Sequence, residues 1–363
     1  MISRRQVLAM AGAAPVWSMM ASCIEAGAVP QDNQAPVGLK NFTRMGGTPS
    51  AFMMHFQASP KGTKPFDMIE HCHSLGLAGV QTNPPSNDPE AVKAFRQRLE
   101  KYGMHLICDP FRFPRQESEL EAFEAQIKAF KEAGAVACHA ALTGRRYEDY
   151  DTLEPFRQMF EDCKKSVALA EPIFRKHKMK LGIENHKGWR SDEQVAWLQR
   201  LGSEWIGVCL DFGNNISLCE DPDETLQKLA PYTVFAHIKD VAVEPYEDGF
   251  LLAEVPLGEG LLDLKKFVRT LREKDPGMIF DLEMITRDPL KIPVFTRKYW
   301  ATFDDSYSPL PGRDLAKVLA MVKKNPPKSA LPKMAGLNPK EQLKAEDDYN
   351  AKCIAYARQQ LDL

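Results

Sequence analysis

Four short apolar runs in the second half of the chain each contain or end at a side chain that can bind a metal ion. The side chains are Glu184, Asp211, His237 and Glu283, and the runs are Leu181–His186, Ile206–Asp211, Val234–Asp240 and Met278–Glu283. Parallel barrel strands present reactive side chains at their carboxyl ends. Three carboxylates and one imidazole that meet there would form a metal site of mainly oxygen ligands.

Each of these side chains also has an ordinary structural interpretation. Glu184 and Glu283 could be buried ion-pair partners, and His237 could be a hydrogen-bonded core histidine. Asp211 precedes the Gly/Asn-rich stretch Phe212–Asn215, where an aspartate is often a turn former or a helix cap. No single residue is decisive, but their occurrence at four consecutive predicted strand ends favours the metal site.

The elements that must position these side chains alternate between strand-like and helical patterns. The other predicted strands are Ala51–Phe56, Gly79–Thr82, His105–Cys108 and Ala135–Ala141. Helical periodicity covers Pro65–Leu75, Pro89–Tyr102, Glu117–Ala133, Leu153–His177, Asp192–Leu201, Pro222–Leu229 and Leu262–Lys274. Eight strands with intervening helices predict an α/β fold of the (β/α)8 TIM barrel type. No Gly-rich phosphate turn follows an early strand, which argues against a doubly wound sheet.

The barrel accounts for only part of the chain. We assign residues 49–310 to it and interpret 29–48, rich in Pro, Gln, Gly and Asn, as a linker. Two further helices, Leu315–Lys324 and Lys340–Gln360, predict a C-terminal helical extension over 311–363.

The N-terminus has the pattern of an export signal. Arg4 and Arg5 form a twin-arginine pair, the run from Val7 to Cys23 is uncharged, and Ala26–Ala28 supplies small residues for cleavage. We therefore predict a signal peptide over 1–28 and a periplasmic or otherwise exported protein. Met20–Cys23 also resembles a lipoprotein processing box, so a lipid anchor at Cys23 stays open, as does an amphipathic N-terminal helix.

The overall composition excludes several kinds of partner. The 363 residues carry a net charge of −2, which gives no bulk attraction to nucleic acid. Beyond the N-terminal stretch there is no long uncharged apolar run, so we expect no membrane span.

Cys108, Cys138 and Cys209 lie within predicted strands and are interpreted as small core residues. No Cys-x-x-Cys pair indicates a structural zinc or redox site.

Several of these stretches together resemble a known family. They are Gly182–His186, Leu210–Asn214, His237–Asp240, Pro256–Gly260 and Leu282–Glu283. The chain resembles the xylose isomerase-like barrels over about residues 50–290, specifically the sugar phosphate isomerase/epimerase group with its ketose 3-epimerases and inosose-processing enzymes.

The resemblance implies a function for the four strand-end residues. They would hold one divalent metal ion, with Mn²⁺ preferred and Mg²⁺, Co²⁺ or Zn²⁺ as alternatives, and Glu184 and Glu283 would also exchange protons with the substrate. A divalent cation polarises a carbonyl and stabilises the enediolate left when the adjacent carbon loses its proton. Three carboxylates around one such ion leave a net negative site, which predicts that one glutamate is protonated.

The chain departs from the epimerase pattern beside this site. Asn214 stands where those enzymes carry a substrate-binding histidine, and Lys239 is the nearest cation where they carry an arginine. Candidate substrate contacts are His186, Lys239, Asn214, His139 and Arg287. Lys239 could instead pair with Asp240, and Arg287 with Asp288.

These features predict a metal-dependent sugar isomerase or epimerase that acts on an unphosphorylated keto-sugar or cyclitol. A lyase or hydratase that acts on a 3-keto glycoside would begin with the same proton abstraction, so it stays as an alternative. A non-catalytic sugar-binding barrel is the second alternative. The related DNA-repair nucleases of this fold carry more histidines, and nuclease activity is not expected. The partner is a small carbohydrate, and homo-oligomerisation stays open.

Overall fold

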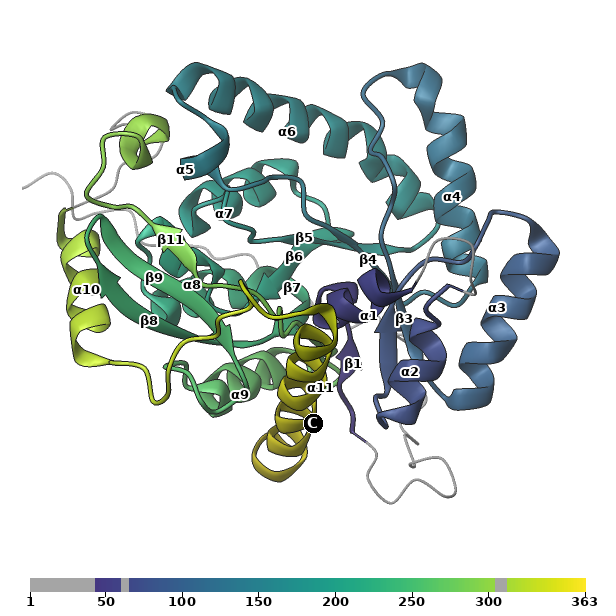
Figure 1. The fold of residues 1–363 in the computed structure, drawn as a ribbon. Helices are drawn as coiled ribbons and strands as arrows, with labels where there is room; N and C mark the ends of the chain where they lie inside the picture. The colour runs from purple at the N-terminus through teal and green to yellow at the C-terminus, as the bar shows by residue number, and fades with distance from the viewer. Residues whose placement is uncertain (1–42, 60–64, 304–311) are drawn as a thin grey trace, which may run out of the picture. The chain divides into compact units, whose positions relative to one another are not determined.

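Eight parallel strands close into a barrel in the computed structural model of the chain (Figure 1), which describes residues 43–59, 65–303 and 312–363. The order around the barrel is β1-β10-β7-β6-β5-β4-β3-β2. The bounds are β1 Gly46–Gly47, β2 Gly79–Gln81, β3 His105–Cys108, β4 Ala137–Ala140, β5 Lys180–Glu184, β6 Ile206–Asp211, β7 Thr233–Ile238 and β10 Phe280–Leu282. This arrangement confirms the predicted TIM barrel.

Helices follow the barrel strands and surround them. Their bounds are α1 Met53–Ala58, α2 Met68–Ser74, α3 Pro89–Tyr102, α4 Leu120–Glu132, α5 Arg146–Asp149, α6 Leu153–Lys176, α7 Ser191–Leu201, α8 Pro222–Leu229 and α9 Leu264–Lys274. Local signals set several of these limits. At α3, the side chain of Asp88 accepts a hydrogen bond from the Ala91 N–H, Pro89 takes the first turn, and Gly103 ends the helix with φ 63°.

The first strand is not where the sequence predicted it. Ala51–Phe56 is helical, partly a 3₁₀ turn and partly α1, and β1 is the glycine pair Gly46–Gly47, inside the stretch interpreted as a linker. A β-carbon at Gly46 would lie 2.0 Å from Oδ1 of Asp281, which bonds His105 in the barrel interior. The strand therefore needs glycine, and glycine carries no hydrophobic signal.

A second sheet, which the sequence analysis did not predict, stands beside the barrel. It is antiparallel, with the order β11-β9-β8, and its strands are β8 Asp240–Tyr246, β9 Gly249–Val255 and β11 Leu290–Ile292. The first of these strands begins two residues after β7 ends, and the third follows β10. The sheet is therefore built from the two segments that follow β7, which carries His237, and β10, which ends directly before Glu283.

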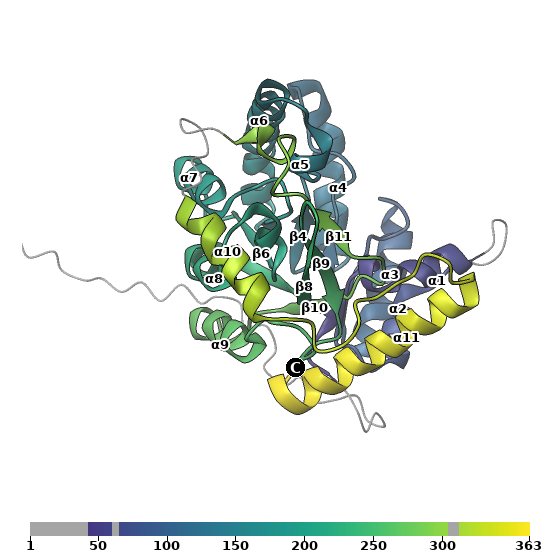
Figure 2. The ribbon, with the colours of Figure 1, turned by 60° about the vertical axis from the view of Figure 1, so that its left-hand side comes forward.

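The C-terminal extension contains both predicted helices, α10 Gly312–Lys324 and α11 Pro339–Tyr356. Figure 2 shows α11 lying along α1. Buried Glu346 of α11 accepts hydrogen bonds from the backbone N–H groups of Met54 and His55 at 2.7 and 3.2 Å. Because these donors lie at the start of α1, the extension caps that helix.

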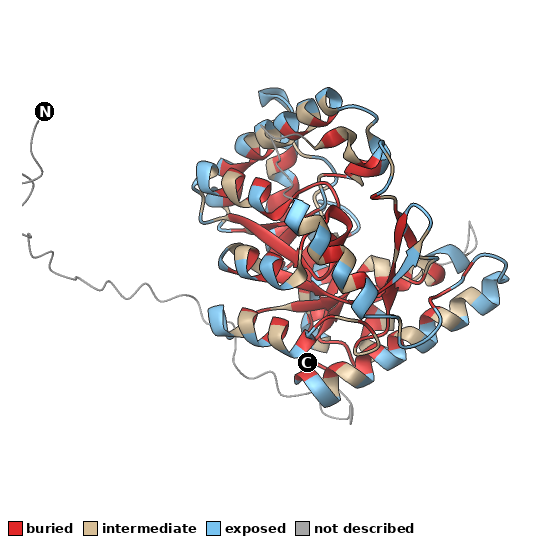
Figure 3. Cartoon of the chain, turned by 90° about the vertical axis from the view of Figure 1, so that its left-hand side faces the viewer, coloured by how far each residue is buried: buried red, intermediate tan, exposed pale blue. Residues whose placement is uncertain are grey.

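Burial follows the expected pattern for such a barrel. Figure 3 shows buried strands inside and helices whose outer faces are exposed. Cys108, Cys138 and Cys209 are fully buried, and all seven cysteines of the described part are free thiols. Among the described helices, none is both long and apolar enough to cross a bilayer. The predicted signal peptide, most of the linker and Cys23 lie outside the described residues.

Candidate metal centre

The four strand-end residues converge at the carboxyl end of the barrel. One ligand atom from each of Glu184, Asp211, His237 and Glu283 lies within 4.8 Å of the others, and all four residues are buried. Parallel pairing produces this arrangement, because Asp211 lies opposite His237 in register and the Glu283 N–H donates to the Ile238 carbonyl at 3.0 Å.

Two atoms of this cluster have no hydrogen-bond partner in the described structure. They are Oδ1 of Asp211 and Nδ1 of His237. The other ring nitrogen of His237 lies 2.8 Å from Oε1 of Gln81, an oxygen that can only accept, so Nε2 carries the hydrogen. Burial lowers the pKa of His237 and favours the neutral ring. A neutral imidazole with a free Nδ1 lone pair beside an unpaired carboxylate oxygen fits a divalent cation.

Glu184 is held on its other side by His139. Nε2 of His139 donates to Oε2 of Glu184 at 3.0 Å, and Nδ1 donates to Oδ1 of Asp109 at 2.6 Å. Burial alone would lower the pKa of His139, but the two carboxylates raise it to about 10. Burial likewise opposes ionisation of Glu184, but the bond from His139 lowers its pKa to about 2. His139 is therefore positively charged and holds the Glu184 carboxylate by a hydrogen bond.

Lys239 lies inside the carboxylate cluster and is almost completely buried. Its Nζ donates to Oδ2 of Asp211 at 2.7 Å and to Oε2 of Glu283 at 3.0 Å. Despite burial, this ammonium group lowers the pKa of Glu283 well below its ordinary value. Burial and the nearby Glu283 instead raise the pKa of Asp211. Both glutamates are thus paired with cations that lower their pKa values, and these shifts do not support the predicted protonated glutamate.

Asn214 links the acidic and basic parts of the site. Its Nδ2 donates to Oε1 of Glu184 at 3.1 Å and also to Asp211, while its Oδ1 accepts from Lys239 at 3.0 Å and from Lys187 at 2.5 Å. All the hydrogen-bonding groups of the Asn214 side chain are thus used within the protein. Asn214 accordingly positions the charged residues around it.

Lys187 is a buried cation that the sequence analysis did not single out. It is 2% exposed, and burial, together with the nearby Lys239, lowers its pKa to about 8. Sequence offered one signal for it, since it follows the strand that ends at Glu184 by three residues. Its burial beside Asn214 could be seen only in the folded chain.

A family profile, that of the xylose isomerase-like TIM barrels, matches residues 69–301. The chain belongs to this family. The match includes seven of the eight barrel strands. It also includes Glu184, Asp211, His237 and Glu283, which we call the acidic cluster.

One curated relative is similar over a shorter region. It is a 3-oxo-isoapionate decarboxylase from Pectobacterium atrosepticum, 32% identical over 106 residues. The alignment covers 29% of this chain and 38% of the relative. Less than half of the relative's length is therefore represented.

Solved structures extend the likeness in fold to most of the chain. A D-psicose 3-epimerase crystallised in the presence of D-fructose has 13% identity and a TM-score of 0.57, covering 88% of this chain and all of that one. A sugar phosphate isomerase/epimerase from Parabacteroides distasonis has 11% identity and a TM-score of 0.50, covering 92% and 99%. At these identities the likeness shows the fold alone.

Within this xylose isomerase-like barrel, two more of the predicted substrate contacts are His186, after β5, and Arg287, after β10. Nδ1 of His186, on the loop after β5, lies 3.2 Å from the backbone carbonyl of Gly144. Arg287 forms a bidentate pair with Glu254 of β9, with bonds of 3.1 and 2.5 Å, and does not pair with Asp288. The antiparallel sheet, absent from the prediction, supplies this partner.

The other predicted ion pair is also absent. Lys239 contacts Asp211 and Glu283, and Asp240 instead accepts four backbone N–H groups. Successive residues of an extended chain point to opposite sides, so Lys239 and Asp240 cannot readily meet.

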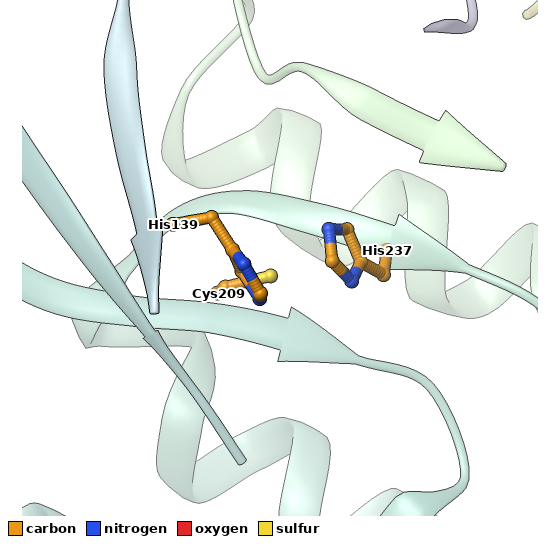
Figure 4. A group of neighbouring side chains, drawn as sticks. All are labelled: His139, Cys209 and His237. Carbon is orange, nitrogen blue, oxygen red and sulfur yellow. The ribbon is translucent and has the colours of Figure 1, made fainter. Parts of the chain in front are cut away.

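A second group of possible ligands shares His237 with the site. Figure 4 shows His139, Cys209 and His237 gathered together, and one ligand atom from each lies within 4.8 Å of the others. Burial raises the pKa of the Cys209 thiol well above its ordinary value, so it is not a thiolate ligand. Both nitrogens of His139 are already bonded to carboxylates. Cys209 and His139 are therefore not available as metal ligands in this arrangement.

Two further polar residues were missed in the first half of the chain. Gln81 ends β2, and Asp109 follows β3 directly. Nε2 of Gln81 donates to Oδ1 and Oδ2 of Asp109 at 3.0 and 3.2 Å, which joins the supports of His237 and His139. Both occupy strand ends, so the rule that identified the four ligands could have found them.

Proposed function

We propose that this protein is a divalent-metal-dependent isomerase or epimerase that acts on an unphosphorylated keto-sugar or cyclitol. The observation that carries the proposal is the convergence of Glu184, Asp211, His237 and Glu283, with unpartnered Asp211 and His237 atoms among them. A divalent cation held by these residues would supply Lewis-acid polarisation of the substrate carbonyl. Oxygen-rich ligands with one imidazole favour Mn²⁺, with Mg²⁺, Co²⁺ or Zn²⁺ as alternatives.

The order of the barrel strands supports a role for the two glutamates in proton transfer from different sides. In the barrel, β5 and β10 are separated by β6 and β7, so Glu184 and Glu283 approach with Asp211 and His237 between them. Both pKa values are lowered, by His139 and Lys239 respectively against the effect of burial, so both carboxylates are ionised near neutral pH before the reaction. One would remove the proton beside the carbonyl and so become an acid. The proton returned to a different face or carbon would come from that acid, or from a solvent proton taken up by the other glutamate.

A reaction that breaks a bond beside the keto group is the second candidate. Partial similarity to a 3-oxo-isoapionate decarboxylase favours it. Loss of CO₂ from a 3-oxo acid leaves its electron pair in the same type of enediolate, and loss of a β-substituent from a 3-keto glycoside follows the same proton abstraction. A non-catalytic barrel has less support, since the complete acidic cluster is assembled.

The decisive experiment is a screen of the purified, Mn²⁺-loaded protein against keto-sugars, keto-glycosides and 3-oxo sugar acids in deuterated water. Deuterium in a recovered epimer or isomer supports the leading proposal. An eliminated or decarboxylated product supports the second candidate. Substrate that binds but gains no deuterium and forms no product would contradict both.

A further inference from the structure

A large cavity opens beside the candidate metal centre, between the ends of β3 and β4 and one side of α6. It has a volume of about 790 Å³. Its wall combines the loop after β3 with Leu142 beyond β4 and Met159 of α6. The cavity therefore lies at the end of the barrel that carries the acidic cluster.

Two residues connect the cavity to the reaction site. Asp109 and His139 line it, and His139 donates directly to Oε2 of Glu184 at 3.0 Å. A molecule that reaches across His139 could thus occupy the cavity and the site together.

The size of the cavity exceeds the need of one sugar ring. Pockets of about 300–1,000 Å³ hold drug-sized ligands, and a single hexose is much smaller than these. A free monosaccharide at the acidic cluster would leave this space to water. A substrate with a second ring would use it.

The wall chemistry suits a ring with an apolar face. Phe111 is 79% exposed, the most exposed of the large apolar residues in the described chain, and it lines the cavity together with Phe113, Leu142 and Met159. Exposed aromatic side chains bind other rings by stacking or edge contacts. Arg112, Arg115, Asp162 and Lys165 also line the cavity, and these charged groups can bond to ring hydroxyls.

We propose that the substrate is a keto-glycoside whose oxidised sugar lies at the acidic cluster and whose attached ring lies in this cavity. The attached ring is an aromatic aglycone or a second sugar. This inference rests on the proposed function, because it assumes that the sugar under reaction is bound at Glu184 and Glu283.

Binding of unreactive glycosides tests the inference separately from turnover. The probes are 4-nitrophenyl β-D-glucopyranoside and methyl β-D-glucopyranoside, titrated calorimetrically into the Mn²⁺-loaded protein. We expect the aryl glycoside to bind about tenfold more tightly, the ratio that corresponds to about 1.4 kcal/mol. Equal affinities, or no binding of either probe, would overturn the inference.

Three variants locate the bound ring. Ser166→Trp fills the cavity from a partly exposed position of α6, and Phe111→Ala removes the exposed aromatic wall. Both should remove most of the aryl preference and leave methyl glycoside binding unchanged. Phe295→Ala is the matched control, because Phe295 is also exposed, at 61%, but does not line the cavity. An aryl preference that survives Ser166→Trp would place the ring elsewhere and contradict the inference.

The deuterium screen distinguishes the two failures. If no substrate exchanges or reacts while the aryl preference persists, the proposed function fails and the cavity still binds rings. If a free keto-sugar reacts and the aryl preference is absent, the proposed function holds and the keto-glycoside inference fails.

Discussion

At the scale of single residues, three of the four predicted ligands are oriented by a polar partner from another segment of the chain. Gln81 fixes the hydrogen on His237, His139 holds Glu184, and Lys239 pairs with Glu283. Such partners orient ligands and determine their protonation. The consequences of substituting a ligand should therefore differ from those of substituting its support.

Glu283→Gln and His237→Ala should separate proton transfer from metal binding. The glutamine keeps an oxygen donor but cannot ionise, so we expect retained metal and a loss of turnover of about 10²–10⁴. His237→Ala removes a nitrogen ligand, and excess Mn²⁺ should restore part of its rate. Metal titration, with about one ion per wild-type chain expected, and solvent-proton exchange are the measurements. Near-normal exchange in Glu283→Gln would show that Glu283 is not an acid or base.

Gln81→Leu should weaken the metal site without removing a ligand. The leucine cannot accept the Nε2 hydrogen of His237, so the ring loses its fixed tautomer. We expect metal affinity to fall by about 10–100-fold. Gln81→Glu keeps an acceptor oxygen and should retain more of the affinity in the same titration. Equal metal affinities of Gln81→Leu and wild type would show that Gln81 does not support the metal site.

Lys187→Met should stabilise the fold at neutral pH and weaken activity. The folded-state pKa of about 8 lies below the ordinary 10.5, so the fold disfavours the charged amine. That cost is present below about pH 8 and disappears as pH rises to about 10.5. We expect a gain of roughly 1–3 kcal/mol at pH 7 and little at pH 10.5, measured by urea unfolding. A gain that is independent of pH would contradict this assignment.

At the scale of elements, Asp240 fixes the loop Pro256–Leu262 against the start of β8. Its Oδ1 accepts the N–H groups of Val241 and Leu262, and its Oδ2 those of Gly258 and Gly260, at 2.9–3.2 Å. A β-carbon at Gly260 would lie 2.1 Å from Oδ1 of Asp240. The close approach explains the glycine, and the buried carboxylate explains why a loop without regular structure holds its shape.

Asp240→Asn should be strongly destabilising although it keeps the shape of the side chain. The amide nitrogen would face two backbone N–H groups that then lose their acceptor. We expect a loss of about 2–4 kcal/mol in the free energy of unfolding, measured with urea. Glu259→Gln is the control, because this glutamate of the same loop forms a partly exposed pair with Lys352, and a change below about 1 kcal/mol is expected. Similar losses for both variants would contradict a specific role of Asp240.

At the scale of the whole molecule, the C-terminal extension is tied to the start of the barrel. Glu346 and Asn350 of α11 bond the backbone around α1, nearly three hundred residues earlier in the chain. Both ends of the described chain therefore meet on one side of the barrel. The predicted export signal precedes this assembly, and a twin-arginine route carries folded proteins.

We propose export by that route, and Arg4→Lys with Arg5→Lys should leave the precursor in the cytoplasm. The paired arginines would be the address read by the export receptor. Cell fractionation followed by immunoblotting measures the periplasmic share. Arg44→Lys, a surface position, serves as the control and should not change the share. Normal export of the doubly substituted chain would refute the twin-arginine interpretation.

The sequence alone determined the barrel and the four residues of the acidic cluster. Strand length, apolar runs and strand-end polar residues are local properties, and parallel closure brings such ends together by geometry. The limits of α3, α8 and β6 agreed with the prediction because caps, proline and glycine mark them in the chain itself.

Only the tertiary structure decided what surrounds those four residues. The ion pairs of Lys239, the pair of Arg287 with Glu254 and the bond of Gln81 to His237 join residues from 28 to 156 positions apart. No local pattern specifies such partners, because periodicity reports burial and not which group lies opposite. The glycine strand β1, the antiparallel sheet and the cavity beside His139 likewise depend on how distant segments pack.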